Sequence, residues 1–224
     1  MKRYVTFLLP LALVPAASAG QRFFDDFEGK DLGEHWEFRN PDAEMVYSVH
    51  DSLLEVHSVS GFYPREWISA SIPEFGDFDM RARVGWTDDV SFHQLIVMLD
   101  DGWTYGRTPI AFMEYEHCCE RGRGWNWLIA GFRDGPTRWM VAPPGGFHEF
   151  RMARTGDEVS AYFDETLILR GTASTIPARF VTLYFEGRTV DLFVDRVSVV
   201  PEPLSAFGLA MGMGALALRR RRTR

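Results

Sequence analysis

Residues 150–159 read FRMARTGDEV, two β-type segments joined by Thr155-Gly156-Asp157. Phe150 and Met152 lie two residues apart with Arg151 between them, so the apolar and the charged side chains fall on opposite faces of a strand. A glycine between short polar residues is typical of a tight hairpin turn. Residues 78–84, FDMRARV, alternate in the same way. The sequence therefore predicts antiparallel strands with one face in a core and the other in solvent.

The same kind of segment recurs along most of the chain. From Phe23 to Val199, short β-type runs end at Gly, Pro, Asp or Asn, and no helical period extends over twelve or more residues. We expect strands at Phe23–Phe27, Leu53–Ser58, Trp67–Ile72, Phe78–Val84, Phe92–Leu99, Ile110–Glu116, Trp125–Phe132, His148–Arg154, Glu158–Phe163, Arg179–Phe185 and Val190–Val199. About a dozen strands fit an all-β, two-sheet antiparallel sandwich.

The chain is long enough for one core and too short for two. It has 224 residues, of which 46% are hydrophobic, so a single domain is expected. We place this domain at residues 20–200, with a signal peptide at 1–19 and a sorting and anchor segment at 201–224.

The N-terminus has the layout of a cleavable signal peptide. Lys2 and Arg3 precede an apolar stretch from Val5 to Pro15, and the small residues Ala17-Ser18-Ala19 follow. An uncleaved membrane anchor is the alternative, but the apolar stretch is shorter than the roughly 20 residues of a spanning helix. The sequence therefore predicts export.

The C-terminus has three blocks in a fixed order. Pro201-Glu202-Pro203 precede the uncharged run Leu204–Leu218, and an arginine cluster ends the chain. The cluster consists of Arg219, Arg220, Arg221 and Arg222, followed by Thr223 and Arg224. An amphipathic helix packed on the domain is the alternative, but the run has no polar face. An apolar helix with arginines on its cytoplasmic side would act as a stop signal after export.

This tail resembles the PEP-CTERM signal of certain Gram-negative bacteria. The resemblance implies that an apolar helix holds the protein transiently in the inner membrane until an exosortase-type enzyme removes the tail. The protein would then move to the cell surface or the extracellular matrix.

The predicted mature domain is acidic. Residues 20–203 contain 17 basic against 31 acidic residues, a net charge of −14. Nucleic acid and anionic lipid are therefore not expected as partners. A neutral polysaccharide or a calcium ion is compatible with this charge.

The domain also resembles the concanavalin A-like lectin/glucanase domains, including laminin-G-like modules. The matching stretches are Phe24-Asp25-Asp26-Phe27, His35-Trp36, and residues 51–56, 148–164 and 193–199. The resemblance implies a jelly-roll sandwich with a concave sheet, a fold that binding, catalytic and structural proteins share.

Glu114 and Glu116 are the candidate catalytic residues. Alternation places them on the same face of a strand about 7 Å apart, and paired carboxylates are what glycoside hydrolysis uses. The family that the domain resembles includes glucanases whose catalytic strand carries Glu, Asp and Glu at every second position. Here Cys118 takes the third place, which argues against hydrolysis. Solvent-facing or arginine-paired glutamates are the alternative.

A set of aromatic residues is the candidate glycan-binding site, because aromatic rings stack on sugar faces and neighbouring polar groups bind hydroxyls. The candidate substrate-binding residues are Trp125, Trp127, Tyr115, Trp103, Asn126 and His93. Trp125 and Trp127 share one face of their strand. The alternative is that one or both belong to the core.

Cys118 and Cys119 are the two cysteines of the chain. In an exported protein we favour a vicinal disulfide between them, with two free thiols or an intermolecular bridge as alternatives. A zinc site needs more ligands than they and His117 supply.

Asp25, Asp26 and Asp195 come from the first and last predicted strands and are candidate ligands of a structural Ca²⁺ ion. Solvated acidic side chains at strand ends are the alternative. No other cofactor is expected.

Together these features favour a non-catalytic carbohydrate-binding protein of the cell surface or matrix. A secreted glycoside hydrolase and a purely structural envelope protein are the alternatives.

Overall fold

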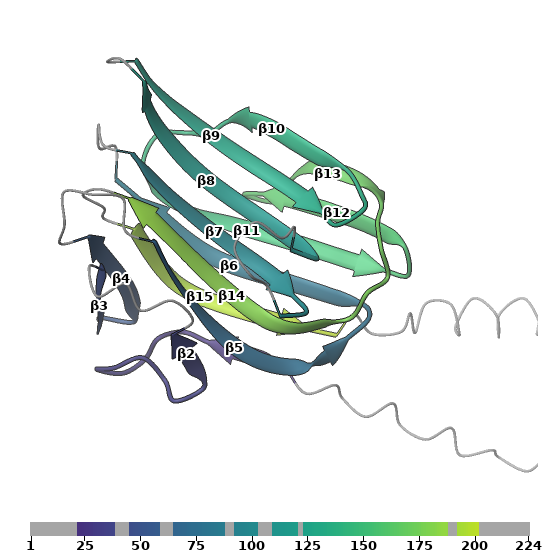
Figure 1. Cartoon of the computed structure of the whole chain (residues 1–224), viewed down its shortest axis with the longest axis horizontal. Coiled ribbons are helices and arrows are strands. Elements are labelled where there is room, and N and C mark those ends of the chain that lie inside the picture. The colour runs from purple at the N-terminus through teal and green to yellow at the C-terminus, as the bar shows by residue number, and fades with distance from the viewer. Residues whose placement is uncertain are drawn as a thin grey trace, which may run out of the picture.

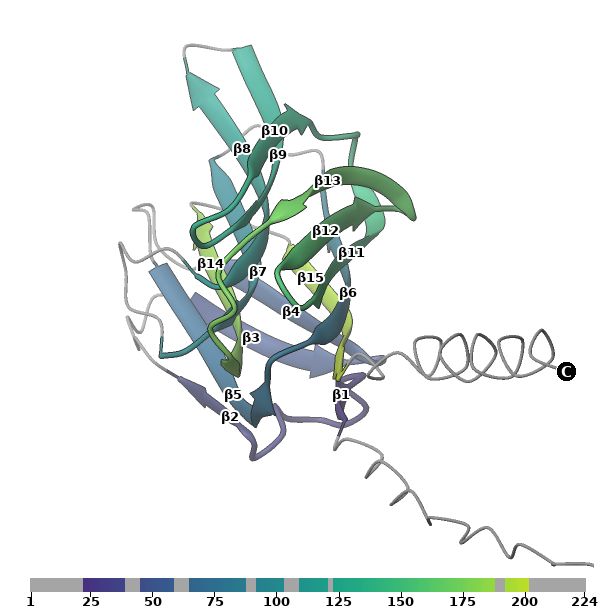
Figure 2. The same ribbon diagram turned by 90° about the vertical axis from the view of Figure 1, so that its right-hand side faces the viewer.

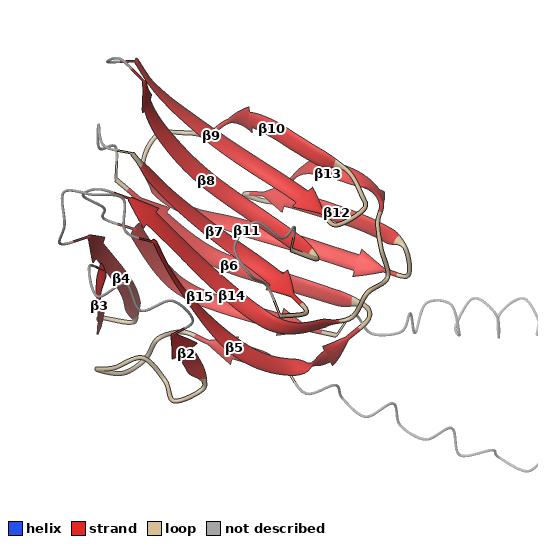
Figure 3. Ribbon diagram, viewed as in Figure 1, coloured by secondary structure: helices blue, strands red, loops and turns tan. Residues whose placement is uncertain are grey.

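The computed structural model describes residues 22–38, 45–58, 65–87, 92–102, 109–120, 123–187 and 192–201. These residues form fifteen strands and no helix (Figure 3). Among them, accordingly, no helix is long and apolar enough to cross a bilayer. The predicted signal peptide, the arginine cluster and the sorting motif after Pro201 lie outside the described residues.

The strands form two antiparallel sheets that pack as two layers (Figure 2). The eight-stranded sheet has the order β13 (Thr166–Thr172), β12 (Glu158–Phe163), β11 (Gly146–Thr155), β6 (Phe78–Trp86), β15 (Leu192–Val200), β4 (Leu53–Ser58), β3 (Met45–His50), and β1 (Phe23–Asp25) also pairs with β15. The seven-stranded sheet has the order β10 (Thr137–Val141), β9 (Arg123–Phe132), β8 (Ala111–Glu120), β7 (His93–Asp100), β14 (Ala178–Gly187), β5 (Arg65–Phe75), β2 (Trp36–Phe38) (Figure 1). The predicted all-β, two-sheet antiparallel sandwich is confirmed.

Strand alternation determines which side chains fill the core between the sheets. On β6, Met80 and Val84 are buried in the core, whereas Asp79, Arg81 and Arg83 face outward. Each sheet therefore has one core face and one outer face.

Stacked aromatic rings join the two layers. Trp86 of β6 stacks on Tyr115 of β8, with ring centroids 3.9 Å apart. This contact is made by two fully buried side chains, one from each sheet.

The hairpin predicted at Thr155-Gly156-Asp157 joins β11 to β12. Thr155 pairs with Glu158, and Gly156 has a φ of 62°, a conformation that glycine adopts without steric cost. The Gly156 N–H donates to Asp77 Oδ1 at 2.8 Å, so the turn is also tied to the β5–β6 connection.

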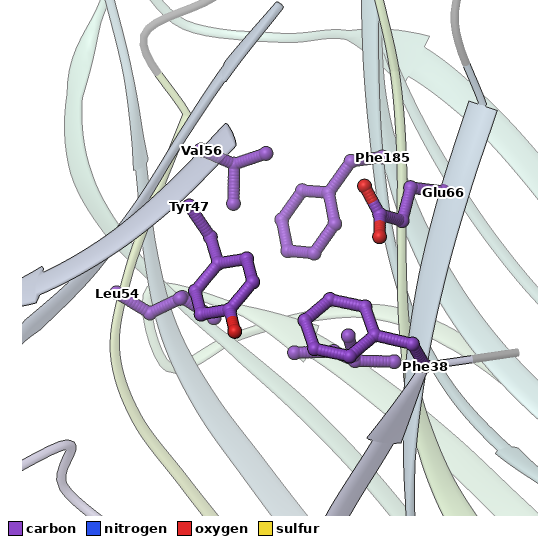
Figure 4. Close-up of a pocket in the computed structure, with 7 residues that line it drawn as sticks. Phe38, Tyr47, Leu54, Val56, Glu66 and Phe185 are labelled. Carbon is purple, nitrogen blue, oxygen red and sulfur yellow. The ribbon is translucent and has the colours of Figure 1, made fainter. Parts of the chain in front are cut away.

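A small pocket lies between the sheets near their β2 and β3 edges (Figure 4). The rings of Phe38 and Tyr47, 4.8 Å apart between centroids, lie on one side of it, and Phe185 and the Glu66 carboxylate also line it. Because both sheets contribute to its walls, this pocket belongs to the inter-sheet packing.

Candidate functional site

Glu114 and Glu116 lie on the outer face of the seven-stranded sheet. Met113 and Tyr115, the alternate residues of β8, belong to the buried core cluster. The two glutamates therefore point away from the core and share one face, as the alternation in the sequence predicts.

Strand register places Glu116 in a row of side chains that crosses six neighbouring strands of Figure 1. Each residue of this row is the direct cross-strand partner of the next. In order from β10 to β5 the row consists of Val141, Trp127, Glu116, Gln94, Glu186 and Arg65. We call this set the central row. It combines an indole, an amide, two carboxylates and a guanidinium on one face.

Glu186 is a third carboxylate that the sequence analysis missed. Arg65 Nε lies 3.0 Å from Glu186 Oε1, and the Tyr184 O–H donates to Glu186 Oε2 at 2.5 Å. Both contacts hold the Glu186 carboxylate in place. Glu186 thus adds a carboxylate from β14 to the face that carries Glu114 and Glu116.

Glu114 is nearly buried, with 9% of its surface exposed. Burial raises the pKa of its carboxyl to about 7, a hydrogen bond donated by Gln94 opposes the shift, and the charges of Glu116 and Glu186 add to it. Burial and the charge of Glu186 also raise the pKa of Glu116. Near neutral pH the site therefore holds a carboxyl that exchanges its proton beside carboxylates.

A series of hydrogen bonds between buried polar side chains links neighbouring strands on the same face. The Thr182 O–H donates to Asp100 Oδ2 at 2.7 Å, and Ser69 Oγ lies 2.7 Å from Thr182 Oγ1. Strands β5, β14 and β7 are therefore joined by side-chain hydrogen bonds as well as by their ladders. Such links give the outer face a fixed shape.

The predicted aromatic site is only partly brought together. Trp127 is half-buried on the outer face, directly opposite Glu116. Trp125 pairs with Cys118 and lies two residues before Trp127 on the same strand. The side chain of Trp125 lies outside the described residues, and so does the whole of Trp103.

Three other predicted binding residues lie on the core side of the sheet. Tyr115 is fully buried against Trp86, and His93 is 1% exposed and stacks on His117 at 5.1 Å. Asn126 pairs across the strands with His117 and hydrogen-bonds its ring. Because these side chains alternate with Glu114, Glu116 and Trp127, the outer-face site excludes them.

Cys118 and Cys119 belong to β8, which continues through them to Glu120. Their side chains lie outside the described residues, so the vicinal disulfide stays a prediction.

The three candidate calcium ligands have protein partners. Asp25 Oδ1 accepts from the Phe27 N–H at 2.7 Å, and its Oδ2 lies 2.6 Å from Trp36 Nε1. Asp26 Oδ1 accepts from the Glu28 N–H at 3.4 Å, and Asp195 pairs with Arg83 at 2.7 Å. Within the described residues, no group of three or more His, Cys, Asp or Glu side chains has the geometry to hold a metal ion.

No family model matches the chain, and no curated protein matches its sequence. Solved structures share its fold. A CBM2 module of an evolved Dit protein of Lactobacillus casei BL23 phage J-1 has a TM-score of 0.61 at 13% identity, covering 81% of this chain and 95% of that one.

Two glycoside hydrolases also share the fold. The laminarinase catalytic domain of Thermotoga maritima MSB8 has a TM-score of 0.59 at 12% identity, covering 81% of this chain and 97% of its own. A family 16 glycosyl hydrolase of Mycobacterium smegmatis has a TM-score of 0.53 at 14% identity, covering 79% and 98%. These similarities place the fold with the concanavalin A-like sandwiches, as the sequence predicts, and at such identities they show the fold alone.

Proposed function

We propose that this protein binds a polysaccharide on the outer face of its seven-stranded sheet. The observation that carries the proposal is the central row, in which Trp127 lies directly beside Glu116, and Gln94 lies on the other side of Glu116. An indole face stacks on the apolar face of a sugar, and neighbouring carboxylate and amide groups bind its hydroxyls. Both kinds of group are present on one accessible surface.

The similar solved structures support this proposal. They include a module named as carbohydrate-binding and enzymes named as laminarinases. The strongly acidic domain favours an uncharged ligand over nucleic acid or anionic lipid.

Affinity electrophoresis of the full chain in gels containing laminarin, barley β-glucan, xylan or galactan tests the proposal. We expect retardation by at least one polymer, and about tenfold weaker binding for Trp127→Ala and Glu116→Gln. Phe24→Ala is the matched control, because Phe24 is 58% exposed on the eight-stranded sheet. Unretarded wild-type protein would favour a purely structural role.

Glycoside hydrolysis is the second candidate function, favoured by the pKa of about 7 for Glu114 beside the more exposed Glu116. One protonated and one ionised carboxyl on neighbouring same-face positions is the combination that glycosidases use. A reducing-sugar assay on the same polymers tests it. Product release that Glu114→Gln abolishes would establish hydrolysis, and binding without product would leave the lectin-like function.

We further propose that the protein is exported and sorted to the cell surface or matrix. The support is the N-terminal signal pattern and the Pro201-Glu202-Pro203 tail with its arginines. Deleting residues 201–224 should move the protein from the membrane fraction to the soluble exported fraction. Unchanged fractionation would contradict the anchoring role.

A further inference from the structure

Among the tryptophan side chains that the structure describes, that of Trp139 is the most exposed. It is 59% exposed on β10, the edge strand of the seven-stranded sheet, and Val141 on the same strand is 69% exposed. Such an apolar surface on an edge is costly to leave in water and favours association. A binding partner for this patch is therefore expected.

Trp139 packs against a neighbouring ring. Its indole meets that of Trp127 edge to face, with centroids 6.4 Å apart and an interplanar angle of 77°. This T-shaped arrangement is a favoured aromatic geometry. The pair, which we call the aromatic arm, thus presents two contacting indoles on the outer face.

Strand register places the aromatic arm next to the carboxylates. Trp139 pairs with Ile129, and Ile129 pairs with Glu114, so all three lie in one row on the same face. Neighbouring strands are about 4.8 Å apart, which puts Trp139 about 10 Å from the strand of the glutamates. Because β10 is the edge strand beside β9 (Figure 1), the arm continues the central site outward toward the sheet edge.

We propose that Trp127 and Trp139 bind successive sugar units of an extended glycan chain, with Trp139 as the residue that selects long chains over short ones. The proposal rests on the polysaccharide-binding function above. A short ligand fills the position between Glu116 and Trp127, whereas only a longer chain crosses β9 and reaches Trp139. The apolar faces of sugar rings match the exposed indole, and their hydroxyls stay in solvent at the open edge.

Affinity as a function of chain length tests this inference. The full chain is titrated with size-fractionated hydrolysates of whichever polymer retards it, from disaccharide upward. We expect wild-type affinity to increase with chain length. Trp139→Ala should bind the shortest bound fragments as the wild type does, but should lose about tenfold in affinity for long chains.

Two further variants separate stacking from structure. Trp139→Tyr keeps an aromatic face and should restore most of the dependence on length, whereas the equally exposed Phe24→Ala should change nothing. Unfolding midpoints of all variants should agree, because Trp139 contributes little buried area.

The outcomes distinguish this inference from the proposed function. If no polymer binds, both fail. If a polymer binds and Trp139→Ala keeps the full dependence on chain length, Trp139 is not part of the binding surface, although the central site with Trp127 stands. If sedimentation shows a wild-type dimer that Trp139→Ala converts to a monomer, a second copy of the chain covers the patch and the inference is overturned.

Discussion

Glu114 and Arg154 are both buried ionisable side chains, but they differ in what surrounds them. Arg154 is 1% exposed and is surrounded by backbone carbonyls of the β5–β6 and β13–β14 connections. Glu114 accepts a hydrogen bond from Gln94 and faces two further carboxylates, those of Glu116 and Glu186. Burial is thus compensated at Arg154 and only partly compensated at Glu114.

Glu114 makes stability depend on pH. Its folded pKa of about 7 lies above the ordinary value of 4.5, so between these values the unfolded chain ionises while the folded protein keeps its proton. The free energy of unfolding is therefore reduced as pH rises through this window. Relative to Glu114→Gln, wild type should lose about 3 kcal/mol between pH 4.5 and about 8.

Urea unfolding of both proteins at several pH values measures this difference. Glu28→Gln, at an exposed position, is the control and should follow the wild type. If the free energies of unfolding of the wild type and Glu114→Gln changed equally with pH, burial would not raise the pKa of Glu114.

Arg154 clamps two connections to β11. Its Nε donates to Gly76 O at 2.6 Å, and its Nη1 donates to Ser174 O and Ile176 O at 2.9 and 2.8 Å. Arg154→Met keeps the apolar volume but leaves these carbonyls without their donor. We expect a loss of about 3 kcal/mol or more in the free energy of unfolding.

The matched substitution is Arg170→Met, where the side chain is 68% exposed and forms a 3.6 Å ion pair with Glu158. It should cost less than about 1 kcal/mol. Chemical denaturation of both variants gives the comparison, and equal losses would contradict the role of Arg154 as a clamp.

At the scale of strands, the sequence pattern predicted the inner strands of both sheets and did not predict the strands at their edges. The four strands that were not predicted are β13 and β3, which end the eight-stranded sheet, and β10 and β2, which end the seven-stranded one. In β10 four of five residues are exposed. An edge strand needs less apolar alternation because less of it is buried, so its pattern is weaker.

The candidate site shows the same limit. Alternation within one strand correctly put Glu114 and Glu116 on one face, and the same reasoning assigns Tyr115 to the other face. Glu186 and Gln94 lie on other strands, and their positions beside Glu116 follow from register. Register between strands far apart in sequence depends on the packing of the whole sandwich, which a single sequence does not reveal.

Gly135 joins the β9–β10 turn to the opposite sheet. A Cβ at this position would lie 2.6 Å from Ala173 Cβ and 2.9 Å from the Thr172 carbonyl oxygen. Because that oxygen belongs to the backbone at the end of β13, the two segments would have to separate. Gly135→Ala should therefore cost about 1–3 kcal/mol.

Gly76→Ala is the matched substitution, since a Cβ there would meet no atom within 4 Å. It should leave stability within about 0.5 kcal/mol of the wild type. Thermal unfolding of the two variants measures the contrast. If Gly135→Ala were as stable as the wild type, the packing of β10 and β13 would not depend on this close approach.

At the scale of the whole molecule, the first and last strands close the sandwich. β1 pairs with β15 through Phe23 and Val199, and β15 ends at Val200, directly before Pro201. The domain is thus complete between the two terminal segments to which we assign export and sorting. Their removal should leave the fold intact.

The N-terminal segment, β1 and the residues that follow it to Phe27, also fills part of the core. Phe23 and Phe27 pack against Trp36, with ring centroids 5.7 and 6.0 Å away, and Asp25 accepts a hydrogen bond from the Trp36 indole. Burying each phenylalanine contributes about 1.5–3 kcal/mol. A chain of residues 28–201 should therefore be about 3–6 kcal/mol less stable than one of residues 20–201.

Denaturant unfolding of these two fragments and of the full chain makes the test. Residues 20–201 should unfold in one transition with the midpoint of the full chain's domain, because neither terminal segment is needed to complete a sheet. Residues 28–201 should show a lower midpoint or no cooperative transition. If both fragments were equally stable, β1 would be dispensable, and the resemblance carried by Phe24-Asp25-Asp26-Phe27 would mark no structural element of the domain.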